Sequence, residues 1–100
     1  MIDLDEKSMQ SVKAILHEHA PDCKVLAFGS RVTGTAHKFS DLDLALICDA
    51  PIDWRRIESL KDAFSESDLP IMVDILDWHT LSETFRTMIK DKFEVLQNPK

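Results

Sequence analysis

The chain has 100 residues, which is enough for one compact domain with a single core and too few for two. Hydrophobic residues make up 44% of it and charged residues 30%, as in globular proteins, and no stretch is long and apolar enough to span a bilayer. The formal net charge of −6 argues against broad binding of nucleic acid, and the acidic N-terminus lacks the features of a secretory signal. We therefore expect one cytoplasmic domain, residues 1–100, with no membrane partner and no direct nucleic-acid partner.

The first half of the chain alternates helical and strand patterns. Apolar residues at helical spacing predict the first helix, and short apolar runs bounded by glycine or polar residues predict strands. The predicted elements are a helix that Asp3 or Asp5 caps and that ends near His19, a strand over 24–28, a short helix over 31–35 capped by Ser30, and a strand over 42–48.

The second half continues this alternation and ends in a segment that can be read in two ways. The predicted elements are a helix over 54–65 capped by Asp53, with Trp54, Ile57, Leu60 and Phe64 on its buried side, a strand over 71–76, and a last helix with a capping box over Thr80–Glu83 and with Phe85, Met88 and Ile89 on its apolar side. Residues 93–96 either continue this helix or form an extended tail, and the pattern does not decide between the two.

The order of these elements predicts an α/β (α+β) fold. We expect a small mixed sheet of about three strands, flanked by helices that lie mostly on one face. A chain of this length has little left to cover the second face, so we expect that face to carry a polar site or a partner.

The chain has two cysteines, Cys23 and Cys48, which lie at or beside the two apolar runs of its first half. Cytoplasmic proteins rarely keep disulfides, and free cysteine behaves as a small buried hydrophobe. We therefore expect two buried thiols rather than a disulfide.

Two aspartates at the start of the second strand, Asp41 and Asp43, are candidate metal ligands. Side chains alternate along a strand, so both carboxylates point to the same face, about 7 Å apart. Carboxylates so placed repel each other and raise each other's pKa unless a divalent cation lies between them, and Mg²⁺ prefers such oxygen ligands. Without a second motif, this pair is more often only a solvated strand edge.

The second motif is Gly29-Ser30, at the end of the first strand. Glycine lets backbone N–H groups approach a phosphate closely, and the Ser30 hydroxyl adds a donor. If the two strands are neighbours, the ten residues that follow Ser30 return the chain to the same end of the sheet. Asp74, in the third strand, can complete a metal site or accept a proton, and its competitor Asp77 can simply form a turn.

Gly29-Ser30, a ten-residue spacer and Asp41-Leu42-Asp43 resemble the GSx10DxD signature of the DNA polymerase beta-like nucleotidyltransferase superfamily. The flanking residues, together with Val73-Asp74-Ile75-Leu76, resemble the minimal nucleotidyltransferase (MNT) family over nearly the whole chain. The resemblance implies metal-binding and catalytic roles for Asp41, Asp43 and Asp74, and nucleotide binding by Gly29, Ser30 and Arg31. It also implies Mg²⁺, as two ions, for a cofactor and ATP for a substrate.

Members of the MNT family are typically paired with a HEPN-domain protein in a toxin–antitoxin system. The resemblance therefore implies transfer of AMP to a hydroxyl group, a tyrosine, of a HEPN ribonuclease toxin, which is neutralised as a result. The alternatives are an antitoxin that occludes its partner without catalysis, and nucleotidyl transfer to a small molecule.

The phosphate turn departs from the family pattern after Arg31. Where the family often has a second arginine, this chain reads Val32-Thr33-Gly34, and His37 or Lys38 can substitute for the missing basic residue. Arg31 itself can bind phosphate or form a surface ion pair, and the sequence leaves both open.

Overall fold

Helices and strands alternate through the chain, as the sequence predicts. The computed structural model describes residues 2–100. Its elements are α1 (Glu6–His19), β1 (Lys24–Phe28), α2 (Ser30–Thr33), β2 (Leu42–Ile47), α3 (Trp54–Ser65), β3 (Val73–Asp77), the 3₁₀ helix η1 (Trp78–Thr80), α4 (Glu83–Asp91) and β4 (Glu94–Gln97).

The strands form one mixed sheet in the order β3-β2-β1-β4. β1 pairs antiparallel with β2 on one side and with β4 on the other, whereas β2 and β3 are parallel. Parallel neighbours need a crossover connection, which α3 supplies. The predicted α/β class is therefore confirmed, and the C-terminal segment takes the extended alternative, because β4 pairs with β1.

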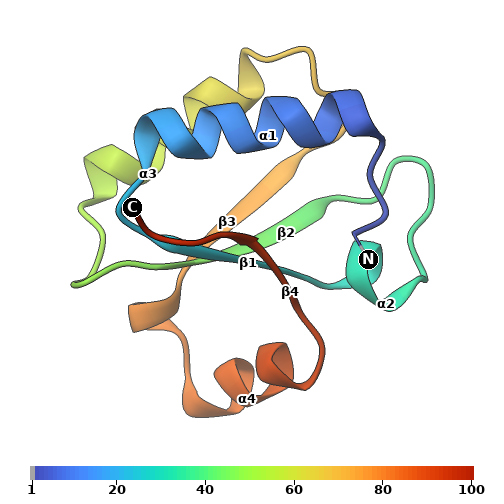
Figure 1. Ribbon diagram of the computed structural model, residues 1–100. Helices are drawn as coiled ribbons and strands as arrows, with labels where there is room; N and C mark the ends of the chain where they lie inside the picture. The colour runs from blue at the N-terminus through green and yellow to red at the C-terminus, as the bar shows by residue number, and fades with distance from the viewer. Residues whose placement is uncertain (1) are drawn as a thin grey trace.

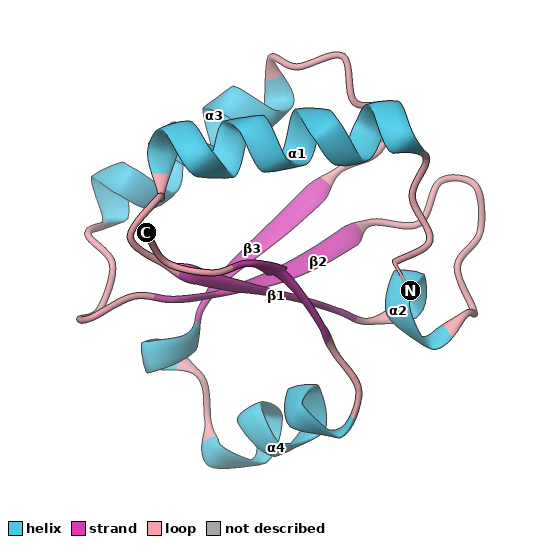
Figure 2. Cartoon of the chain, viewed as in Figure 1, coloured by secondary structure: helices cyan, strands magenta, loops and turns pink. Residues whose placement is uncertain are grey.

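Helices cover both faces of the sheet (Figures 1 and 2). α1 and α3 pack on one face, where the core is formed by Val12, Leu16, Val25, Ala27, Leu42, Leu44, Leu46, Leu60 and Phe64, among others. α4 packs on the other face, with Ile89 against Leu26, Phe28 and Ala45. The expectation that the second face stays uncovered was wrong, because β1 is apolar on both faces and the last helix returns to cover the second one.

The helix caps confirm some of the predicted start signals and correct others. Asp5 accepts a hydrogen bond from the Ser8 backbone N–H, and Asp53 accepts one from Arg55, as predicted. The prediction of a capping box that starts at Thr80 was wrong, because Ser82 caps α4 and Glu83 is the first helical residue. The cap predicted at Ser30 was also wrong, since Gly29 occupies that position.

Two residues predicted to be buried are largely exposed. Trp54 is 69% exposed, with the Arg55 guanidinium 5.4 Å from its ring, and Met88 is 56% exposed. Both occupy the right helical period, but Trp54 is the first residue of α3, and the helix contacts the core only further along, at Leu60 and Phe64. The periodicity therefore identified the apolar side of each helix correctly, but it overestimated how much of that side is buried.

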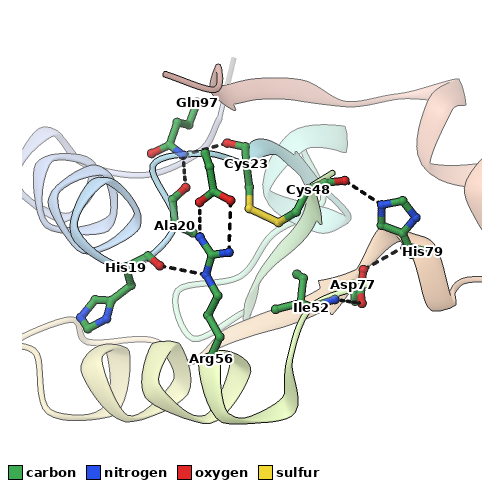
Figure 3. Close-up of a disulfide and its surroundings, with 10 residues drawn as sticks. His19, Ala20, Cys23, Cys48, Ile52, Arg56, Asp77, His79 and Gln97 are labelled. Atoms are coloured by element: carbon green, nitrogen blue, oxygen red, sulfur yellow. Dashed lines mark hydrogen bonds and ion pairs between the residues drawn. A yellow bond between two sulfur atoms is a disulfide. The ribbon is translucent and has the colours of Figure 1, made fainter. Parts of the chain in front are cut away.

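Cys23 and Cys48 form a disulfide, so the expectation of free thiols was wrong (Figure 3). Both are buried, as predicted, but the antiparallel register places Lys24 opposite Ile47, and the next pair outward is the two cysteines. Their Cα atoms lie 4.3 Å apart. Closing a loop of 25 residues stabilises the fold by about 3.5 kcal/mol over the reduced chain in the chain-entropy account.

Hydrogen bonds around the disulfide join several elements at this end of the sheet (Figure 3). The Gln97 amide donates to the carbonyl oxygens of Ala20 and Cys23, which ties β4 to the turn before β1. Arg56 donates to the His19 carbonyl oxygen and pairs with Asp22, which joins α3 to the end of α1. This end is opposite to the one where Gly29 and the paired aspartates lie, so the disulfide anchors the scaffold away from the candidate site.

Candidate active site

Three neighbouring strands bring the predicted site residues to one end of the sheet. Phe28, the last residue of β1, lies opposite Asp43, and Asp43 lies beside Asp74 in the parallel register. Gly29 follows Phe28 directly, so the glycine turn, the β2 carboxylate and the β3 carboxylate stand in a row. The expected adjacency of Gly29-Ser30 and the aspartate pair is confirmed.

Asp41 lies just before β2, at the rim of this row, and its side chain is exposed. The next residue is held firmly, because the Leu42 backbone N–H donates to the Met72 carbonyl oxygen at 3.0 Å, at the start of the β2–β3 pairing. Asp41 therefore faces solvent from a fixed backbone.

The competitor residue Asp77 has a different role. Its carboxylate accepts hydrogen bonds from the backbone N–H groups of Ile52 and His79, at the far end of β3. It stabilises a turn and caps η1, as the alternative reading of the sequence proposed.

Electrostatics single out Asp43 within the row. Burial raises the pKa of its carboxyl group above the ordinary value of 3.8, and the negative charges of Asp74 and, more weakly, Asp41 raise this pKa further. The Asp43 carboxylate thus lies within electrostatic reach of the other two, and the chain does not neutralise its charge. A divalent cation would relieve this repulsion.

The donor chemistry of the row suits Mg²⁺, which binds carboxylate oxygens and keeps several waters. Within residues 2–100, however, no three Asp, Glu, His or Cys side chains are grouped closely enough to form a metal site unaided. The row fits a cation that takes only some of its ligands from the protein and the rest from water and phosphate oxygens.

Gly29 is required at its position for two reasons. Its φ of 82° and ψ of −159° lie in a region that other residues rarely adopt, and a Cβ there would overlap the Asp43 carboxylate. The glycine therefore lets the β1–α2 turn pack directly against the middle carboxylate. The hydroxyl of the next residue, Ser30, makes no hydrogen bond within residues 2–100 and remains available to a ligand.

We expect Gly29→Ala to lower the free energy of unfolding by about 3 kcal/mol, because both the backbone strain and the displacement of Asp43 disfavour the fold. Gly34→Ala is the matched control, since Gly34 also has a positive φ, 87°, but open space around it. It should cost only about 1 kcal/mol. Urea unfolding measures both changes, and equal effects at the two glycines would contradict the packing argument.

Arg31 is buried, at 7% exposure, and its guanidinium group binds backbone carbonyl oxygens. It donates to the carbonyl oxygens of Ser40 at 2.9 Å, Asp3 at 2.7 Å, Lys38 at 3.1 Å and His37 at 3.4 Å. It forms no ion pair within residues 2–100, so that part of the expectation was wrong. The bonds fold the ten-residue spacer back onto α2 and fix the residue that precedes Asp41.

This role of Arg31 was missed in the sequence, although a single arginine next to a glycine turn, followed by a polar loop that must fold back, was a signal for it. The acceptors are main-chain oxygens, which every residue has, so no side-chain pattern marks them. One of them, at Asp3, lies 28 residues away in the chain.

Comparison with known proteins agrees with this geometry. Residues 10–99 match the family described as "Polymerase beta, Nucleotidyltransferase". The chain is 51% identical over 96 residues to the "Probable protein adenylyltransferase MntA" of Haemophilus influenzae, a match that covers 96% of this chain and 84% of that protein. The resemblance stated from the sequence is confirmed.

Solved structures share the fold at low sequence identity. One is a crystal structure of a toxin–antitoxin with AMP-PNP. The match covers 92% of this chain and 74% of the chain in that structure, with a TM-score of 0.70 and 22% identity. Another is a structure of a tri-AMPylated Shewanella oneidensis HEPN toxin in complex with an MNT antitoxin. The match covers 95% of this chain and 73% of the chain in that structure, with a TM-score of 0.64 and 17% identity.

Proposed function

Because this chain belongs to the polymerase beta nucleotidyltransferase family, we propose that it is an antitoxin that transfers AMP from ATP to a hydroxyl group of a HEPN-domain toxin and so neutralises it. The observation that carries the proposal is the row of Gly29, Asp43 and Asp74 at one end of the sheet. The 51% identity to a probable protein adenylyltransferase supports AMP as the transferred group. The shared fold with toxin–antitoxin structures supports the class of partner.

Each residue of the row has a role in this proposal. The Gly29-Ser30 turn holds the triphosphate, with the free Ser30 hydroxyl as a donor. Bound Mg²⁺, held by Asp41 and Asp43 with Asp74 as the third carboxylate, would neutralise charge on the phosphate oxygens.

Asp74, exposed at the start of β3, is the residue we assign to accept the proton of the attacking hydroxyl. The new bond joins the acceptor oxygen to the α-phosphorus as the bond to pyrophosphate breaks. We propose a tyrosine as the acceptor.

We place the reaction in the cytoplasm, where ATP is made and used. None of the helices within residues 2–100 has the length and apolarity that a membrane crossing requires.

Intact-mass analysis of a cognate HEPN partner tests the proposed function. We expect the partner to gain one or more adenylyl groups after incubation with this protein, ATP and Mg²⁺, and to lose its ribonuclease activity. Omission of ATP is the control. A partner that is silenced without any gain in mass would support occlusion and contradict transfer.

A further inference from the structure

A cavity of about 790 Å³ opens beside the row of carboxylates. It lies between the C-terminal turn of α3, the connection to β3 and the start of β3. Asp41 and Asp74 line it, together with the apolar side chains of Phe64, Leu69 and Val73. One cavity therefore combines an apolar wall with two carboxylates of the candidate site.

The strand beside this cavity is an edge strand. β3 pairs with β2 on one side, and its other side has no strand partner within residues 2–100 (Figure 2). Such an edge can receive an extended polypeptide segment through main-chain hydrogen bonds. Met72, just before β3, lines the cavity and is 74% exposed, so its side chain is open to a docked segment.

If the proposed function holds, the leaving group and the attacking hydroxyl must lie on opposite sides of the row. With the triphosphate on Gly29-Ser30, pyrophosphate leaves on the β1 side of Asp43. In-line displacement then requires the attacking hydroxyl to approach from the opposite side, which is that of β3. Asp74 and the cavity both lie on this side.

The charges of the lining indicate what kind of segment fits. Four charged residues line the cavity. Three are acidic, Asp41, Asp62 and Asp74, and one is basic, Lys61. We infer that the cavity binds the acceptor segment of the partner protein, an extended basic stretch of polypeptide. It packs an apolar side chain against Phe64 and Leu69 and presents its hydroxyl group to Asp74.

We expect Met72→Arg to raise the KM for the partner about tenfold, because it places a positive charge and a long side chain where a basic segment docks. The kcat value and the KM for ATP should stay unchanged. Met88→Arg is the matched control, since Met88 is 56% exposed on α4, which covers the other face of the sheet. It should change none of the three constants.

Two outcomes would overturn the inference. A rise in the KM for ATP with an unchanged KM for the partner would assign the cavity to the nucleoside. Equal effects of Met72→Arg and Met88→Arg would remove the cavity from docking altogether.

A photo-crosslinking amino acid at position 72 separates this inference from the proposed function, because a crosslink does not depend on catalysis. We expect the crosslinked partner peptide to contain the acceptor residue. A wild-type protein that leaves its partner unmodified contradicts the proposed function. Normal wild-type labelling with no crosslink from position 72 contradicts the docking inference alone.

Discussion

Asp43→Asn will reduce AMP transfer roughly a thousandfold, because it removes the middle carboxylate, the one closest to both others, and with it several kcal/mol of charge stabilisation in the transition state. The amide has nearly the same shape as the carboxylate, so the packing of Gly29 against it is preserved. Transfer of label from α-labelled ATP to the HEPN partner measures the loss.

The same substitution should stabilise the folded protein near neutral pH. Burial and the charges of Asp74 and Asp41 raise the pKa of Asp43 in the folded state, so the folded protein holds this proton more tightly than the unfolded chain does. The carboxylate therefore has no destabilising effect below the ordinary pKa of 3.8, and its effect grows as the pH rises through the raised pKa. Urea unfolding from pH 3 to pH 8 should show this decline in wild type relative to Asp43→Asn.

Asp49→Asn is the matched control, since Asp49 is an exposed aspartate just beyond the other end of β2. It should leave both AMP transfer and stability unchanged. If Asp43→Asn kept activity within tenfold of wild type, or lost activity together with stability, the carboxylate row would not be the catalytic centre.

The sequence was informative wherever the deciding interactions are local. Apolar periodicity located β1 and α3 at their observed bounds and the end of α1 at His19, because a helix face or a strand needs only neighbouring side chains to define it. The glycine turn and the aspartate pair could be placed at one end of the sheet, because an antiparallel pair joined by a ten-residue spacer has few other arrangements.

Features that depend on long-range pairing were not accessible in this way. The register that sets Asp74 beside Asp43 comes from a parallel pairing across the α3 crossover, and nothing local in β3 fixes it. The disulfide likewise depends on the register of β1 and β2, since Cys23 and Cys48 are 25 residues apart. The docking cavity is formed by α3 and the start of β3 together, so neither segment marks it alone.

Burial of side chains also depends on what the rest of the chain does. Trp54 has the right spacing for a buried position, but α3 meets the core only after its first turn. The second face of the sheet is covered because α4, which follows η1, packs Ile89 against the residues of β1 and β2 on that face.

Arg31→Met will lower the free energy of unfolding by about 3 kcal/mol, because four carbonyl oxygens lose their donor in a part-buried setting. AMP transfer should fall as well, since the Ser40 carbonyl anchors the backbone just before Asp41. Arg31→Lys should recover only part of either loss, because an ammonium group cannot match the geometry of a guanidinium fork. Urea unfolding and steady-state kinetics measure the two effects.

Arg55→Met is the control for a lost arginine, since Arg55 is exposed on α3 and lies over the Trp54 ring. It should change stability by no more than about 0.5 kcal/mol. The kinetic constants then separate the two roles that an arginine beside a phosphate turn can have. Loss of a residue that positions the spacer lowers stability and kcat together. Loss of a phosphate ligand instead raises the KM for ATP and leaves the free energy of unfolding unchanged. The second result for Arg31→Met would assign Arg31 to nucleotide binding and leave the spacer to be held by other contacts.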